Sequence, residues 1–204
     1  MNDRLLNRFT YAERLIHWVV GVAFVILLLT GFAFSYPSLF WLTTLAGGGG
    51  AARLLHPWVG VIFSIGMVFM LAFWVRDMFL DREDWRWLGS VRDYAARRHD
   101  KVPPAGKYNA GQKAFFWLQG ALAIVFVVTG MLLWIPDWFS ASVLSLSRLF
   151  HYASALAGGL LLVVHVYLGT VAYPGTARGM IDGKVTRNWA AFHHRRWYED
   201  QSGS

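Results

Sequence analysis

The chain lacks cysteine altogether, although it has 204 residues. This absence excludes disulfide bonds, thiolate-bound zinc, cysteine-ligated iron–sulfur clusters and the covalent C-x-x-C-H attachment of haem. Charge is also scarce, because only 15% of the residues are charged, whereas a soluble domain carries about a quarter. A metal ion or cofactor must therefore be held by histidine or by non-covalent contacts.

The scarcity of charge is concentrated in four long runs that contain no Asp, Glu, Lys or Arg. Each run is long enough to cross the hydrocarbon core of a bilayer, which takes about 20 apolar residues. The sequence therefore predicts an all-α protein, a four-helix transmembrane bundle in which residues 1–204 form one domain. The predicted spans are residues 15–36, 54–75, 114–135 and 149–173.

The 19 Lys and Arg residues are distributed unevenly around these spans. Nine lie between the second and third spans, five follow the fourth, and only Arg53 and Arg148 occupy the other two connections. The remaining three, ahead of the first span, are Arg4, Arg8 and Arg14. Because basic residues accumulate on the cytoplasmic side of membrane proteins, both termini and the middle connection are predicted to be cytoplasmic. The net charge of +7 therefore does not require a nucleic-acid partner.

The middle connection contains an amphipathic, Trp-rich segment over about residues 82–100, which is predicted to rest on anionic lipid headgroups. Two residue pairs with the spacing of helix N-caps precede the first and third spans. These pairs are Thr10 with Glu13 and Asn109 with Gln112.

Seven histidines fall into two groups. His99, His193 and His194 lie in basic stretches and are interpreted as solvated side chains. The other four lie within or at the ends of the predicted spans, where an ionisable residue is costly and a functional role is the default hypothesis. These four are His17, His56, His151 and His165.

The predicted topology sorts these four histidines into two pairs. His17 and His56 lie near the N-terminal ends of antiparallel spans, so they belong to opposite sides of the membrane. The fourteen positions between His151 and His165 correspond to about 21 Å of helical rise and to a rotation about 40° short of four full turns. Both therefore project from one face of the fourth span. The expected pairs are His56 with His151 outside and His17 with His165 inside.

Two facing imidazoles from different helices suit the axial ligation of haem iron, because the ligands are neutral and the porphyrin is apolar. Zinc takes three or four ligands, and a proton relay is expected to include an intramembrane carboxylate. We therefore expect two b-type haems that form an electron-transfer path across the membrane. The small residues of ASALAGG (153–159) suit either a close porphyrin or plain helix packing.

Several motifs together resemble one family over most of the chain. They are RLIHW (14–18), LHPWVG (55–60), KYNAGQK (107–113), FHYASA (150–155) and VHVYLG (164–169). The chain resembles the gamma subunit of membrane-bound respiratory formate dehydrogenases, a di-haem, quinone-reducing cytochrome b. KYNAGQK is the most family-specific motif, and the resemblance implies the same histidine pairing.

The resemblance also implies partners and a quinone site. In the family, electrons from formate pass through a molybdenum or tungsten catalytic alpha subunit and an iron–sulfur beta subunit on the periplasmic face of the bacterial inner membrane. They then cross both haems to menaquinone or ubiquinone near the cytoplasmic side, so the chain would be the quinone-reducing subunit of the enzyme. It is left open whether the complex forms a higher oligomer. The matching quinone-site positions are Tyr108, Asn109, Gly111, Gln112 and His165.

Three questions stay open at this point. Asn109 could cap the third span, bind quinone, or do both through its oxygen and its amide. The histidine spacing also suits the cytochrome b subunit of a nickel–iron hydrogenase or of another periplasmic oxidoreductase. In a different class, a haem-free membrane anchor or transporter would use the histidines only for packing.

Overall fold

The computed structural model describes residues 5–96 and 98–203. Arg4 and Arg97, two of the basic residues counted above, and the side chain of His99 lie outside the described residues. The chain divides into two compact units, and each is described by itself. The helix unit comprises residues 15–71 and 119–166, and the loop unit comprises the described parts of residues 1–14, 72–118 and 167–204.

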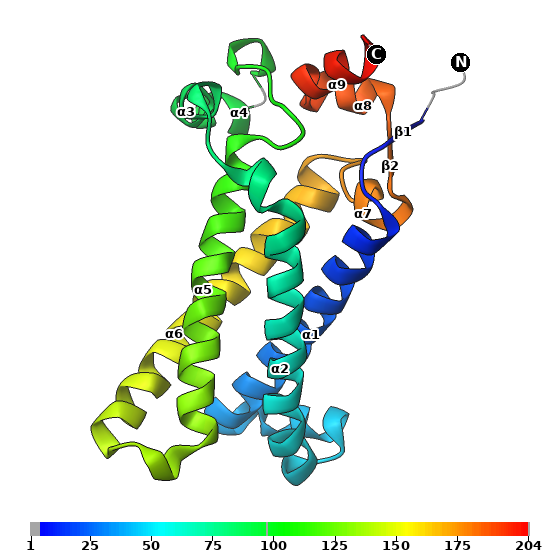
Figure 1. Ribbon diagram of the computed structural model, residues 1–204. Coiled ribbons are helices and arrows are strands. Elements are labelled where there is room, and N and C mark those ends of the chain that lie inside the picture. The colour runs from blue at the N-terminus through cyan, green and yellow to red at the C-terminus, as the bar shows by residue number, and fades with distance from the viewer. Residues whose placement is uncertain (1–4, 97, 204) are drawn as a thin grey trace. The chain divides into compact units, whose positions relative to one another are not determined.

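Within residues 5–96 and 98–203, the elements are four long helices, several short ones and two strands (Figure 1). The long helices are α1 (Tyr11–Ser35), α2 (Gly49–Trp74), α5 (Ala110–Trp134) and α6 (Ala141–Tyr167). The short elements are β1 (Leu5–Asn7), α3 (Arg82–Gly89), α4 (Val91–Ala95), α7 (Arg178–Asp182), β2 (Lys184–Thr186), α8 (Arg187–His193) and α9 (Arg195–Ser202). Short 3₁₀ turns cover Pro37–Ala46, Val75–Met78, His99–Lys101 and Pro136–Trp138, and a π-helical turn covers Leu168–Ala172.

The four long helices are each apolar and long enough to cross a membrane. The prediction of a mostly helical protein with four spanning helices is therefore confirmed, and the chain is a multi-pass membrane protein. One departure from the all-α class is a small antiparallel sheet, in which Leu6 of β1 lies opposite Val185 of β2. The cytoplasmic location of the termini and the single domain stay predictions.

Polar caps start α1 and α5 ahead of their apolar runs. The Thr10 hydroxyl accepts from the Glu13 N–H at 3.3 Å, and the Glu13 carboxylate accepts from the Thr10 N–H at 2.7 Å. Asn109 Oδ1 accepts from the Gln112 N–H at 2.9 Å, and Gln112 Oε1 accepts from the Asn109 N–H at 3.0 Å. Both predicted capping pairs are confirmed. Because the caps lie outside the charge-free runs, the helices begin at Tyr11 and Ala110.

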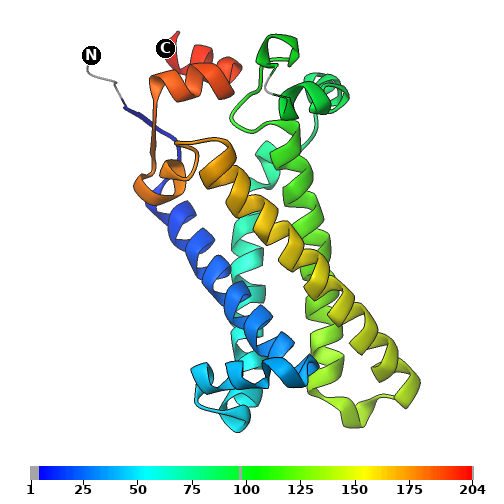
Figure 2. The same ribbon diagram turned by 180° about the vertical axis from the view of Figure 1, so that it is seen from behind.

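The core of the helix unit lies among α1, α2 and α5, with Leu162 of α6 packed against it. Figures 1 and 2 show the four helices of this unit running lengthwise beside one another. A Cβ on Gly158 would come within 2.8 Å of Phe24 Cζ, so any other residue there would displace the buried Phe24 ring where α6 meets α1. The packing interpretation of ASALAGG is therefore supported at Gly158. The buried core residues are Val20, Ala23, Phe24, Val59, Phe63 and Ala123.

In the loop unit, the predicted amphipathic segment forms two short helices, α3 and α4, which meet at Ser90. Asp81 and Asp84 make reciprocal capping bonds of 2.9 Å at the start of α3. Asp84 also forms a buried ion pair of 2.5 Å with Lys113 at the start of α5. Lys113 was counted among the basic residues of the cytoplasmic connection, and its side chain is in fact buried.

A second cluster of the loop unit joins both ends of the chain. Arg8 is buried and donates to the Lys107 carbonyl at 2.6 Å and to His194 Nε2 at 3.2 Å. Its guanidinium lies 4.8 Å from the ring centre of Trp189 and 4.9 Å from that of Trp197. Burial lowers the pKa of Arg8 to about 10, and the nearby Tyr108 opposes this shift.

The interpretation of His194 as a solvated side chain is wrong. Only 2% of the residue is exposed, and its Nδ1–H donates to the Gly106 carbonyl at 2.7 Å. Burial lowers its pKa well below the ordinary value, and the Arg8 guanidinium lowers it further. The basic sequence around His194 did not reveal this burial, because the atoms that enclose the ring come from distant parts of the chain.

Candidate functional site

The first imidazole pair lies in the helix unit between α2 and α6. The ring centres of His56 and His151 are 6.3 Å apart, with the ring planes inclined by 61°. Each ring is held by a threonine of a neighbouring helix. Thr30 Oγ1 lies 2.7 Å from His56 Nδ1, and Thr129 Oγ1 lies 2.8 Å from His151 Nδ1.

The second pair lies in the same unit between α1 and α6. The ring centres of His17 and His165 are 6.1 Å apart, with the planes inclined by 47°. The Nδ1 atom of His17 is buried and has no hydrogen-bond partner within the described residues. The structure therefore brings together the same two pairs that were expected from topology, and their role as haem ligands stays a prediction.

Helix α6 contributes one histidine to each pair. It is α-helical from Ala141 to Tyr167, so His151 and His165 are separated by about 21 Å of rise along one helix. Phenylalanines flank the first pair, because Phe34 lies 5.7 Å from His56 and Phe126 lies 5.4 Å from His151 between ring centres. These apolar neighbours suit a porphyrin better than a hydrated ion.

The separation within each pair fits one metal ion between two imidazoles. An imidazole nitrogen binds a metal ion at about 2 Å, so two axial rings have centres about 6 Å apart. The observed 6.1 and 6.3 Å match this requirement. Two imidazoles complete the axial ligand set of haem iron. Within the described residues, no group of three or more His, Cys, Asp or Glu is placed to hold a metal ion.

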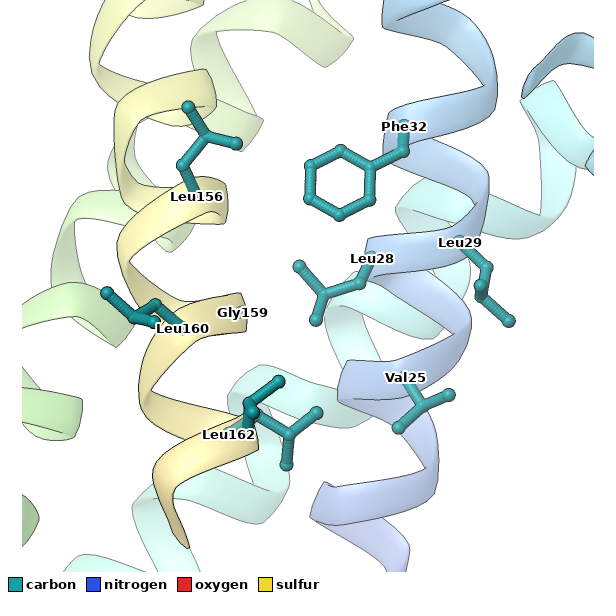
Figure 3. A pocket seen from close by; sticks show the side chains of 9 residues that line it. Val25, Leu28, Leu29, Phe32, Leu156, Gly159, Leu160 and Leu162 are labelled. Atoms are coloured by element: carbon teal, nitrogen blue, oxygen red, sulfur yellow. The ribbon is translucent and has the colours of Figure 1, made fainter. Parts of the chain in front are cut away.

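An apolar groove of about 370 Å³ lies between α1 and α6 in the helix unit. Figure 3 shows Leu28 and Phe32 of α1 facing Gly159 and Leu156 of α6 across it. Its lining side chains are all apolar, so they provide no ligand for iron and suit only an apolar occupant such as a lipid chain.

The predicted quinone-site residues of KYNAGQK lie in the loop unit at the start of α5. The Oδ1 atom of Asn109 caps α5, and the Asn109 side chain also acts on the Tyr94 hydroxyl, whose pKa it lowers. Tyr94 also stacks on Tyr173, with ring centres 4.9 Å apart. Burial raises the pKa of Tyr94, and Tyr173 raises it further. The cap therefore engages the oxygen end of the Asn109 side chain.

The neighbours of Asn109 have structural roles of their own. Gln112 is the reciprocal partner in the cap, and a Cβ on Gly111 would come within 3.2 Å of Trp87 Cη2. The Tyr108 hydroxyl is buried without a hydrogen-bond partner within the described residues. Burial raises the pKa of Tyr108, although Arg8 opposes the shift. The polar cavity that Tyr108 lines measures about 150 Å³, which is small beside ligand pockets of roughly 300 Å³ or more.

His165, the fifth residue expected at the quinone site, belongs to the helix unit. Its assignment to one site with Asn109 therefore rests on the sequence resemblance and not on a distance.

Four apolar spanning helices that bring two imidazole pairs face to face have the architecture of a membrane cytochrome b. Residues 8–183 match the prokaryotic cytochrome b561 family. The chain belongs to this family, and cytochromes of the b type carry b-type haem.

Curated relatives extend over nearly the whole chain. The nitrate-inducible formate dehydrogenase cytochrome b556(Fdn) subunit of Escherichia coli K12 is 34% identical over 201 residues, covering 97% of this chain and 92% of the relative. The formate dehydrogenase cytochrome b556 subunit of Haemophilus influenzae is 32% identical over 204 residues, covering 98% and 85%. The cytochrome b556(fdo) subunit of Escherichia coli K12 is 32% identical over 197 residues. The resemblance to formate dehydrogenase cytochrome subunits is therefore confirmed.

The sequence interpretation missed Thr30 and Thr129. A threonine in an apolar run looks like an ordinary helical residue, since its hydroxyl can bond to its own backbone. One signal was present, because each threonine precedes a glycine in a similar context, LLTG (28–31) and VVTG (127–130).

Proposed function

We propose that this chain is the membrane cytochrome b subunit of a formate dehydrogenase. It carries electrons from a periplasmic iron–sulfur subunit and a molybdenum or tungsten catalytic subunit, through two haems b, to a quinone near the cytoplasmic side. The observation that carries the proposal is the presence of two imidazole pairs with nearly equal ring separations, 6.3 and 6.1 Å. The names of the relatives support the formate dehydrogenase partner.

In this proposal the four histidines are the axial ligands. His56 and His151 hold the outer haem, and His17 and His165 hold the inner one. The sides follow from the uneven distribution of Lys and Arg, which favours cytoplasmic termini. The haems supply reversible one-electron transfer when they are bound, and the apolar side chains around the rings exclude water from them.

The direction of electron flow has an energetic consequence. An electron that moves inward against the membrane potential requires about 2.3 kcal/mol per 100 mV. A strongly reducing donor such as formate suits this task. Quinone reduction that takes protons from the cytoplasm would then add to the membrane potential.

The proposed quinone site contains Asn109 and His165, with Tyr108, Gly111 and Gln112 nearby. The Asn109 amide is a suitable donor to a quinone carbonyl, because its NH₂ group carries two N–H donors and the cap of α5 uses only the side-chain oxygen. The alpha and beta subunits and the bacterial inner membrane are proposed from the same family resemblance.

The native complex provides the test. Purification from the membrane, with metal analysis and reduced-minus-oxidised visible spectra, should give two b-type haems per chain, molybdenum or tungsten, and haem reduction by formate. The absence of a b-type absorbance band in the assembled complex would refute the haem proposal. A nickel-containing partner would instead identify a hydrogenase cytochrome b.

A further inference from the structure

The two histidines of the first pair share the same hydrogen-bonding arrangement. His56 of α2 contacts Thr30 of α1 at 2.7 Å, and His151 of α6 contacts Thr129 of α5 at 2.8 Å. In both cases the ring atom is Nδ1 and the threonine lies on the preceding long helix. The same threonine–histidine contact therefore occurs in the α1–α2 helix pair and in the α5–α6 helix pair.

The direction of each hydrogen bond follows from the second contact of the threonine. Thr30 Oγ1 lies 2.7 Å from the Ile26 carbonyl, and Thr129 Oγ1 lies 2.6 Å from the Val125 carbonyl. A carbonyl oxygen can only accept a hydrogen bond, so each threonine hydroxyl donates its single proton to a backbone carbonyl of its own helix. The hydroxyl oxygen must then accept from the imidazole Nδ1–H. This fixes the neutral tautomer in which Nε2 carries a free lone pair.

The glycine after each threonine faces the same ring. A Cβ placed on Gly31 would lie 3.5 Å from His56 Cε1, and one placed on Gly130 would lie 3.5 Å from His151 Cε1. Each Thr–Gly step therefore provides an acceptor for Nδ1 and a side-chain-free surface beside the ring. The repetition on two helices makes an accidental contact a poor explanation.

The second pair differs in one ligand. Within the described residues, His17 Nδ1 is buried and makes no hydrogen bond. An imidazole that donates its Nδ1–H to an acceptor is a more basic ligand than one that does not. A more basic axial ligand stabilises oxidised iron relative to reduced iron and lowers the reduction potential.

We propose that Thr30 and Thr129 are positioning residues that fix the tautomer of His56 and His151 and lower the potential of the outer haem below that of the inner haem. This inference rests on the proposed function. Electrons delivered from outside would then move energetically downhill between the two sites, which offsets part of the opposing membrane potential. The hydrogen bonds that the two threonines accept thus favour electron transfer from the outer haem to the inner haem.

The test is a redox titration of both haems in the native complex carrying Thr30→Val, Thr129→Val or both. Each valine variant should raise the midpoint potential of the outer haem and leave the inner haem unchanged, with a larger rise in the double variant. Thr→Ser at either position keeps the hydroxyl and should restore the wild-type potential. The outer haem is identified as the one missing from His151→Ala.

Ser64→Ala is a matched control. Ser64 Oγ donates to the Gly60 carbonyl at 2.7 Å in the same way as the two threonines. It lies outside the Thr–His contacts, so both potentials should stay unchanged.

Other outcomes are also decisive. Loss of the outer haem in a valine variant, with retention in the serine variant, would support the positioning role. Unchanged outer potentials in both valine variants, or a shift confined to the inner haem, would overturn the inference. A wild-type complex with fewer than two b-type haems would refute the proposed function itself, so the two failures are distinguishable.

Discussion

Asn109 caps a helix and is also a residue of the proposed quinone site. Its Oδ1 caps α5 through Gln112, and in the proposal its amide group donates to a quinone carbonyl. The two roles use different atoms, so the capping interpretation and the quinone interpretation do not compete. A substitution that changes only one end of the side chain can separate them.

Asn109→Asp retains a capping oxygen and removes the amide donor. We expect this variant to keep the thermal stability of the native complex and both haems but to form quinol more slowly. Asn109→Ala should slow quinol formation and also lose about 1 kcal/mol of helix stability, because the cap is removed. Quinol formation and thermal unfolding measured on both variants check this, and unchanged quinone kinetics in Asn109→Asp would leave only the capping role.

At the scale of elements, a buried ion pair joins α3 to the start of α5. Lys113 donates to Asp84 at 2.5 Å and to the Phe79 carbonyl at 3.0 Å. Both side chains are less than a tenth exposed. This pair attaches the amphipathic segment to a spanning helix through enclosed charges.

Asp84→Asn removes the charge and keeps an oxygen for the cap of α3. Because the Lys113 ammonium is then buried without a charged partner, we expect the free energy of unfolding to fall by about 3 kcal/mol. Thermal unfolding of the purified complex provides the measurement. Glu83→Gln, which breaks the exposed pair with Arg86, should cost less than about 1 kcal/mol, and equal losses in the two variants would contradict the prediction.

The cluster of Arg8 and His194 should make the chain ends sensitive to acid. The His194 ring is neutral in the folded loop unit, because burial and then Arg8 and His193 lower its pKa. An unfolded His194 takes up a proton below about pH 6.5. The contribution of His194 to the free energy of unfolding is therefore fully present above that pH. It falls by up to about 1.4 kcal/mol per pH unit as the pH drops below that value.

Hydrogen exchange of the backbone amides at Val185 and at Leu5–Phe9, measured between pH 7.5 and 5, tests whether stability falls toward acid. Protection should fall toward acid in the wild type. In His194→Gln, which cannot titrate, it should change much less. Protection that stays constant, or rises toward acid, in the wild type would show that His194 is not the responsible group.

At the scale of the whole molecule, the helices were the most predictable feature. Apolar runs become spanning helices because the backbone must satisfy its own hydrogen bonds in lipid. The histidine pairs followed because antiparallel topology restricts which side each residue can occupy. The burial of Lys113 and His194 could not be predicted, since it depends on contacts with residues far away in the sequence.

Histidine variants test the assignment of the two sites in the assembled complex. His151→Ala should remove the outer haem, and His165→Ala should remove the inner haem together with quinone reduction. In His165→Ala, formate should still reduce the remaining outer haem. Visible spectra and quinol formation measure both effects, and loss of the opposite haem in either variant would show that the pairing or the topology is wrong.

The pairing of β1 with β2 determines when the small sheet can form during synthesis of the chain. Leu6 lies opposite Val185, and nearly the whole chain separates the two strands. The ribosome makes the N-terminal strand first, and that strand has no partner until the last spanning helix and the turn after it have been synthesised. The small sheet and the Arg8–His194 contact can thus close only on a chain whose four helices have already been made.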